Sequence, residues 1–243
     1  MVILRPAHQR GSVYLGWLDS HHSFSFGHYY DPQHMGFSSL RVINEDKISP
    51  SQGFGTHGHQ NMEIITYVLS GSLKHQDSLG NGSVLRSGQV QRMTAGTGIF
   101  HSEFNASQQE PVHLLQIWIQ PNILDLPPSY EEITLDLSQI QGSLHPIASQ
   151  NPQPGTVKVH QNMELYASIL KPGDRVTHTL GDDRSVWIQV ARGAVNLTMD
   201  AETIPLAAGD GAAIVQGGTL TLEGNLDGDF GEILLFDLPA PAP

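Results

Sequence analysis

Apolar residues along the chain fall into short runs, many of them β-branched, separated by turn residues at intervals of about ten positions. Examples are EIITYVL at 63–69, HLLQIWI at 113–119 and EILLFDL at 232–238. Short β-branched segments bounded by Gly, Pro, Asn and Ser are typical of the strands of a sandwich or barrel. The pattern therefore predicts an all-β protein.

Helix is expected only as one short turn, near PPSYEEI at 127–133. Ser129 could cap this turn, and Glu131 and Glu132 would stand in its first turn, where acidic residues are favourable.

The stretch 125–156 is rich in Pro, Gln, Ser and Gly and lacks strong periodicity. This composition indicates a linker between two halves of the chain. We therefore predict two domains, at residues 1–135 and 136–243.

The two halves resemble copies of one unit. EIITYVLSGSLKH and SVWIQVARGAVNL share a strand, a glycine and a second strand, and their glycines, Gly71 and Gly193, are 122 positions apart. LRSGQVQRM and LAAGDGAAI match around Gly88 and Gly209, which are 121 apart. Two matches at nearly one offset predict an internal duplication. HQNME also recurs, from His59 to His160, but at an offset of 101 it is interpreted as coincidence or an echo of an edge strand.

Composition limits which partners the protein can bind and which atoms could ligate a metal ion. Twelve basic residues against twenty-four acidic ones give a net charge of −12, which disfavours direct binding to nucleic acid. The start, MVILRPAHQR, lacks the apolar stretch of a secretory signal, and the apolar runs are too short to span a membrane, so we expect a cytoplasmic protein with no membrane partner. Because the chain has no cysteine, a metal ion here would bind nitrogen and oxygen ligands.

Two pairs of polar residues carry the candidate chemistry. His57 and His59 follow a Gly-rich turn, and His101 and Glu103 follow another. Residues i and i+2 of a strand point to one face, so each pair projects into a common space. On facing strands, the pairs could surround one divalent ion with three nitrogens and one oxygen at about 2.0–2.2 Å. We predict Fe(II), with Cu, Ni, Mn, Co or Zn as alternatives, and open coordination positions that imply catalysis.

Glu63 stands four residues after His59 in the interpretation of one continuous strand. It could be a metal ligand, an acceptor for an imidazole N–H, or a solvent-facing strand start; because Glu103 already supplies a carboxylate, ligation by Glu63 is the less favoured reading. His75 and Asp77 are expected to be exposed after the first hairpin, and His113 is expected to be a hydrogen-bonded core residue rather than a neighbour of the site.

The N-terminal stretch SHHSFSFGHYYDPQHMGF is rich in histidine and aromatic residues. We interpret its aromatic side chains as packing across a barrel mouth or anchoring the first strands, rather than as cofactor ligands.

The motifs resemble those of a known family. GFGTHGHQNMEIITYVLSG at 53–71 is similar to the first cupin motif, and GQVQRMTAGTGIFHSEFN at 88–105 is similar to the second. FSFGHYYDPQHMGFSSLRVIN, together with MTAGTGIFHSE, resembles more narrowly the pirin family of two-domain cupins. The resemblance implies two cupin-type β-barrels of the jelly-roll kind, a bicupin. It also implies that the metal is held by His57, His59, His101 and Glu103. At the offset of the duplication, the two histidines of the first pair fall on Thr179 and Gly181, so the C-terminal domain is expected to lack metal ligands.

Bacterial proteins of this type are similar to quercetin 2,3-dioxygenases, which open the central ring of a flavonol with O₂ and release CO. The resemblance therefore implies a metal-dependent oxidoreductase with a small aromatic substrate, in which Glu103 could act as the general base for the substrate hydroxyl. The aromatic N-terminal residues could line an apolar pocket for a planar ligand.

Two alternatives stay open at this point. The first is a non-enzymatic, metal-containing and redox-sensitive regulator that binds a protein partner. The second is a purely structural bicupin. A monomer is the default expectation.

Overall fold

The computed structural model describes residues 1–215 and 217–241, and its residues fall into two compact units. The N-terminal unit comprises Gly11–Thr134 with Gln150–Gln161, and the C-terminal unit comprises Met1–Arg10, Leu135–Ser149 and Asn162–Pro243. One change of unit, between Thr134 and Leu135, lies beside the expected boundary, whereas two short segments belong to the unit of the other half. The domain limits 1–135 and 136–243 stay a proposal.

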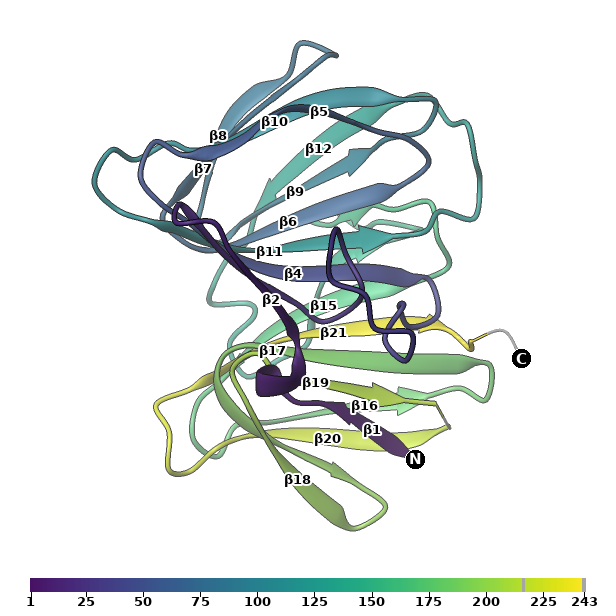
Figure 1. Ribbon diagram of the computed structural model, residues 1–243. Helices are drawn as coiled ribbons and strands as arrows, with labels where there is room; N and C mark the ends of the chain where they lie inside the picture. Colours follow the sequence, from purple (N-terminus) through teal and green to yellow (C-terminus); the bar gives the residue numbers. More distant parts are fainter. Residues whose placement is uncertain (216, 242–243) are drawn as a thin grey trace. The chain divides into compact units, whose positions relative to one another are not determined.

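Strands account for nearly all of the regular structure in the described residues (Figure 1). The strands of the N-terminal unit are β2 (Gly11–Tyr14), β3 (Leu18–His22), β4 (Leu40–Ile48), β5 (Gly53–His59), β6 (Glu63–Ser70), β7 (Ser72–Asp77), β8 (Gly82–Arg86), β9 (Gln89–Thr94), β10 (Ile99–Asn105), β11 (Val112–Ile119), β12 (Ser129–Thr134) and β14 (Val157–Lys158). The C-terminal unit holds the 3₁₀ turn η1 (Ala7–Gln9) and β1 (Val2–Arg5), β13 (His145–Ser149), β15 (Glu164–Leu170), β16 (Arg175–Leu180), β17 (Arg184–Met199), β18 (Glu202–Ala207), β19 (Gly211–Ile214), β20 (Gly218–Gly224) and β21 (Gly231–Pro239).

The N-terminal unit consists of two antiparallel sheets that face each other (Figure 1). One has the order β5-β10-β7-β8, and the other has the order β12-β9-β6-β11-β4-β3-β2. Alternation along each strand sends one set of side chains between the sheets. A buried cluster that includes Val68, Leu73 and Leu114 fills part of this interior, and the candidate ligands lie in another part of it.

The C-terminal unit repeats this architecture with an apolar interior. Its main sheet runs β1-β19-β17-β21-β15-β13, and β20 pairs with both β16 and β17. The core cluster inside it is almost wholly aliphatic and includes Ile188, Ala212 and Leu235. The prediction of an all-β protein with two cupin-type barrels is confirmed.

The glycines that marked the duplication have matching backbone conformations. Gly71 and Gly193 have φ of 77° and 70°, and Gly88 and Gly209 have φ of 81° and 86°. A Cβ on Gly71 would meet the carbonyl oxygen of Pro111 at 2.5 Å, and a Cβ on Gly193 would meet a backbone oxygen at 1.8 Å. Because side chains avoid both positive φ and such close approach, glycine is needed at the same point of each unit.

Two expectations about the middle of the chain are wrong. The helical turn expected near 127–133 is strand β12, which pairs with β9 from Ser129 to Thr134. Arg92, which is buried, forms an ion pair of 2.7 Å with the exposed Glu131 across these strands. Tertiary pairing therefore decides the conformation of a segment with weak local preference. The stretch 125–156 is not a bare linker, because it carries β12 and β13.

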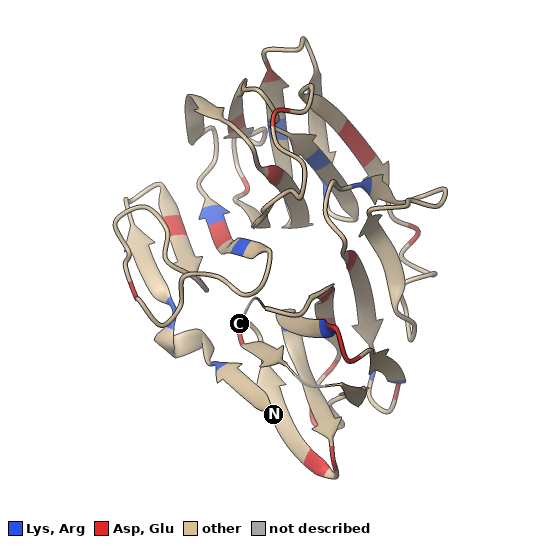
Figure 2. Ribbon diagram, turned by 90° about the vertical axis from the view of Figure 1, so that its right-hand side faces the viewer, with Lys and Arg blue, Asp and Glu red and all other residues tan. Residues whose placement is uncertain are grey.

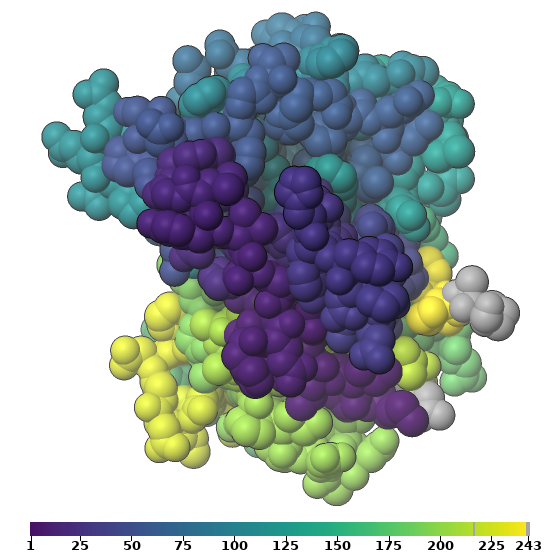
Figure 3. Space-filling view, in the orientation of Figure 1, coloured from purple at the N-terminus to yellow at the C-terminus, as the bar shows by residue number. Residues whose placement is uncertain are grey.

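In the ribbon of Figure 2, Lys and Arg appear as separate bands on several strands, with Asp and Glu positions among them. Figure 3 shows the N-terminal segment, coloured purple to dark blue, at the surface of the face in view. Across residues 1–215 and 217–241, no helix combines the length and the apolar character that crossing a membrane requires.

Candidate metal centre

Strands β5 and β10 bring the predicted histidines together. They pair antiparallel with His101 opposite His57 and Ile99 opposite His59, so the three imidazoles share one face. A Cβ on Gly53, at the start of β5, would meet the backbone oxygen of Glu103 at 2.2 Å. Glycine therefore permits the close approach of the two strands at the register shift between His101 and Glu103.

The three imidazoles meet through one nitrogen each. His101 Nε2 lies 2.9 Å from His59 Nε2 and 3.0 Å from His57 Nε2. His57 Nδ1 lies 2.8 Å from the carbonyl oxygen of Gly55, which accepts its hydrogen and leaves Nε2 with a free lone pair. The geometry thus collects three imidazole nitrogens at one point, as the spacing of the histidines predicted.

Burial keeps the rings of His59 and His101 neutral. Burial, followed by the charge of His57, lowers the pKa of His59 to about 4. Burial also lowers the pKa of His101 to about 2, with further contributions from His57 and His59. A neutral imidazole is the form that binds a metal ion, so both rings are ready to act as ligands near neutral pH.

The residues fit a bound cation. Two ligand nitrogens at about 2.1 Å from an ion lie about 3.0 Å apart when they subtend a right angle, and about 3.4 Å apart in a tetrahedron. The separations of 2.9 and 3.0 Å match the right angle of an octahedral or square arrangement. Facing lone pairs repel each other unless a hydrogen or a cation lies between them. A neutral His101 ring can place one hydrogen in only one of its two Nε2 contacts, whereas a cation would bind all three nitrogens.

Glu103 lies beside the histidines in a polar cradle. Its Oε1 accepts hydrogen bonds from Gln91 Nε2 at 3.0 Å and Thr66 Oγ1 at 3.3 Å, and its Oε2 accepts one from Gln116 Nε2 at 2.7 Å. Burial nevertheless raises the pKa of Glu103 to about 7. The carboxyl group lines the same cavity as His57 and His59. Two groups of ligand atoms converge within 4.8 Å here: the three histidines form one, and Glu103 with His101 and His75 forms the other.

A cavity of 80 Å³, called here the metal cavity, lies between the sheets at this point. Aromatic rings form its flat walls, with Phe26 edge-on to Trp118 at 5.3 Å and His59 edge-on to Trp118 at 4.9 Å. The residues that line it are Phe26, Asn44, Asp46, Phe54, His57, His59, Glu103, Gln116 and Trp118. Phe26 comes from the aromatic N-terminal stretch, so that stretch both packs and lines a pocket.

Glu63 faces away from the metal cavity. Strand β5 ends at His59, Asn61 turns with φ of 51°, and Glu63 starts the next strand, so the interpretation of one continuous strand is wrong. Glu63 is fully buried, where its Oε2 accepts a hydrogen bond from Thr94 Oγ1 at 3.0 Å and its Oε1 lies 3.1 Å from His160 Nδ1. The second HQNME therefore supplies the partner of the Glu63 carboxylate.

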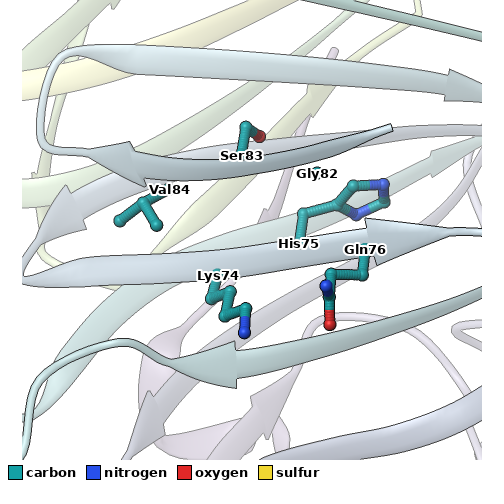
Figure 4. Close-up of a pocket in the computed structure, with 6 residues that line it drawn as sticks. All are labelled: Lys74, His75, Gln76, Gly82, Ser83 and Val84. Carbon is teal, nitrogen blue, oxygen red and sulfur yellow. The ribbon is translucent and has the colours of Figure 1, made fainter. Parts of the chain in front are cut away.

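His75 is buried, contrary to expectation. Its Nε2 lies 3.3 Å from Asp77 Oδ2, both side chains are inaccessible, and its ring stacks on Tyr130 at 4.8 Å. Figure 4 shows the ring of His75 on one side of β7 and the side chains of Lys74 and Gln76 on the other. Alternation along the strand, which the sequence analysis applied to the ligands but not to this hairpin, could have placed His75 inside.

His113 is half-buried and lies 2.9 Å from Glu45 Oε1, outside the metal cavity, as expected for a satisfied residue. Sequence reasoning missed the polar cradle of Glu103 and the wall formed by Trp118. Thr66, Gln91 and Gln116 come from three different strands, so their convergence on Glu103 has no local sequence signal.

Comparisons with known proteins agree with this architecture. The chain matches the family model Pirin over residues 4–119 and the model of the quercetinase C-terminal cupin domain over residues 146–238. A protein of Escherichia coli strain K12 named quercetin 2,3-dioxygenase is 46% identical over 239 residues, which cover 98% of this chain and 99% of that protein. A pirin-like protein of Caulobacter vibrioides is 36% identical over 223 residues, 91% of this chain and 94% of that protein.

Among solved structures, the chain resembles the bacterial pirin YhhW from Escherichia coli in complex with nickel(II). The TM-score is 0.90 at 46% identity, and the match covers 99% of this chain and 100% of that chain. With relatives of this identity over nearly its whole length, the chain belongs to the pirin family of two-domain cupins.

Proposed function

We propose that the chain is a metal-dependent dioxygenase that opens the ring of a flavonol such as quercetin with O₂ and releases CO. The observation that carries the proposal is the convergence of three imidazole nitrogens at 2.9–3.0 Å beside a buried carboxyl group in a cavity with aromatic walls. Relatives named quercetin 2,3-dioxygenase support the choice of substrate. A cytoplasmic location belongs to the same proposal.

His57, His59, His101 and Glu103 would hold one divalent ion. When bound, this ion would act as a Lewis acid on the flavonol 3-hydroxyl and supply an open position at the reacting centre. Nitrogen and oxygen ligands accept several ions. Fe(II) is our first candidate, with Ni, Cu, Mn, Co and Zn as alternatives, and a solved relative contains nickel(II).

Glu103 is the group placed to accept the proton of the 3-hydroxyl. It reaches the same cavity as His57 and His59, and a carboxyl group with a pKa near neutrality is suited to exchange protons at physiological pH. The amides of Gln91 and Gln116 fix its orientation. Phe26, Phe54 and Trp118 would hold a planar ring and exclude water from it.

The test follows the visible absorbance of quercetin, with and without O₂, for protein of known metal content. We expect oxygen-dependent loss of quercetin with release of CO, and a rate more than about 100-fold lower in His101→Ala, because the loss of a ligand harms the centre more than the loss of its neighbours. His178→Ala, a histidine paired with Asp237 in the C-terminal unit, is the matched control and should keep the rate.

Unchanged quercetin in the presence of the bound metal would contradict the proposal. That result would favour the metal-containing regulator that binds a protein partner.

A further inference from the structure

A second cavity adjoins the metal cavity on the side of β2, β3 and β4. It measures 150 Å³ and is called here the side chamber. Its lining comprises Val13, Leu18, Ser20, His22, Phe26, Gly27, His28, Asn44, Asp46 and Phe54. Phe26, Asn44, Asp46 and Phe54 line both cavities, so these four residues form the neck between them.

The metal cavity alone is too small for a two-ring ligand. Pockets for small molecules usually measure about 300–1,000 Å³. The metal cavity measures 80 Å³, and the side chamber of 150 Å³ brings the space closer to that range. A planar substrate with one ring at the histidines must extend elsewhere, and the side chamber lies directly beyond Phe26 and Phe54. Leu18 and Val13 give that chamber apolar walls for a second ring.

A buried polar cluster lies at the neck. Ser20 and Asp46 face each other across β3 and β4, and Ser20 Oγ donates to Asp46 Oδ1 at 2.5 Å. Because this bond uses the only hydroxyl hydrogen of Ser20, its oxygen accepts from His22 Nε2, which lies 2.8 Å away. All three side chains are at most 4% exposed. The cluster therefore holds the Asp46 carboxyl group in one orientation.

Two oxygen acceptors lie at the neck between the cavities. Asn44 Oδ1 is buried without a partner in the described part of the chain, whereas Asp46 Oδ2 faces the neck, because the hydrogen bond from Ser20 uses Oδ1. Buried polar atoms are nearly always satisfied, since an unpaired acceptor destabilises the protein by about 1–3 kcal/mol. A ligand that enters the neck with O–H donors would satisfy both oxygens.

We propose that the side chamber binds a hydroxylated ring of the substrate remote from the metal centre, and that Asp46, oriented by Ser20 and His22, accepts the hydrogen bond of a phenolic hydroxyl on that ring. This inference rests on the proposed function and deepens it. Asp46 is thus a specificity-determining residue, which favours polyhydroxylated flavonols over flavonols that carry only the 3-hydroxyl.

The test compares quercetin with 3-hydroxyflavone, which retains the reacting hydroxyl and lacks the ring hydroxyls. In Asp46→Asn we expect kcat/KM for quercetin to fall about tenfold or more, the scale for a hydrogen bond to a charged group, and kcat/KM for 3-hydroxyflavone to change less than about twofold. Asp19→Asn is the control. It makes the same chemical change on β3, at a side chain that is partly exposed rather than buried. An equal effect of Asp46→Asn on both flavonols, or none on either, would overturn the inference.

Binding separates this inference from the proposed function. Fluorescence titration under nitrogen measures the affinity for each flavonol whether or not either is consumed. Tighter binding of quercetin than of 3-hydroxyflavone, with the difference lost in Asp46→Asn, supports the side chamber even if wild-type protein oxidises neither compound. Equal affinities in wild type and variant contradict it even if quercetin is oxidised. Ser20→Ala removes the hydrogen bond that orients the Asp46 carboxyl group, so it should lose part of the preference for quercetin over 3-hydroxyflavone. This variant replaces Asp46→Asn in the test if Asp46→Asn does not fold.

Discussion

The two units have the same pattern of strand pairing, but the interior of one is polar at this point and that of the other is apolar. In the N-terminal unit, Thr66 of β6 is opposite Gln91 of β9 and Gln116 of β11. In the C-terminal unit, Ile188 of β17 is opposite Ala212 of β19 and Leu235 of β21 in the same register. The first trio forms the cradle of Glu103, and the second trio forms part of an aliphatic core.

The ligand strands differ in the same way. His101 is opposite His57 on β10 and β5, whereas on the corresponding strands β20 and β16 Leu220 is opposite His178. His178 is satisfied by Asp237 at 2.8 Å. Both groups of His and Glu side chains that could hold a metal ion, among the described residues, belong to the N-terminal unit. Backbone pairing is therefore compatible with either interior, and the side chains alone decide which unit carries a site.

The largest expected effect concerns the buried carboxyl group that distinguishes the N-terminal interior. Burial raises the pKa of Glu103 from 4.5 to about 7, so the folded protein holds this proton more tightly than the unfolded chain does. The stabilisation is present below about pH 4.5 and is lost as the pH rises through 7, by on the order of 3 kcal/mol.

Urea unfolding of metal-free protein from pH 4.5 to 8 measures this loss. Glu103→Gln keeps the shape without the titration, so the stability of wild type relative to this variant should fall across the range. Glu110→Gln, at an exposed carboxyl group, should leave the wild-type profile unchanged. If the difference in the free energy of unfolding between wild type and Glu103→Gln stays constant with pH, the pKa of Glu103 is not raised by burial.

The next largest effect is expected when a polar side chain is introduced into the apolar interior of the C-terminal unit. Leu235→Gln places an amide in the aliphatic cluster, where donors like those around Glu103 have no acceptor to bind. We expect a loss of about 2 kcal/mol in the free energy of unfolding and no gain of metal. Leu226→Gln, at a side chain that is 71% exposed, is the control. Equal stability of the two variants would mean that the C-terminal interior tolerates polar groups.

The smallest effect is expected from the reverse exchange. Gln116→Leu introduces the residue type of the C-terminal unit and removes the 2.7 Å hydrogen bond to Glu103 Oε2. We expect metal affinity to fall about tenfold, because groups that orient a ligand are worth about 10–100-fold. Competition with a chelator measures the affinity, with exposed Gln108→Leu as control. Unaltered affinity would indicate that Glu103 does not depend on its cradle.

The sequence alone predicted much of the fold and the convergence of three histidines. Period-two alternation and regularly spaced turns predicted the strands, and the glycine pairs predicted the duplication, because both depend on local backbone geometry. The spacing of His57 and His59 predicted that both rings point to one face. His101 could be added because its own strand starts after a similar Gly-rich turn.

The tertiary structure decided which neighbour each side chain meets. The segment at 129–134 became a strand through pairing with β9, Glu63 turned to His160 rather than to the metal cavity, and His75 was buried. The cradle of Glu103 and the Asp46 cluster join residues from strands far apart in the chain. Strand order and register place such residues together, and a linear pattern of hydrophobicity contains neither, because each strand specifies its own faces but not its partners.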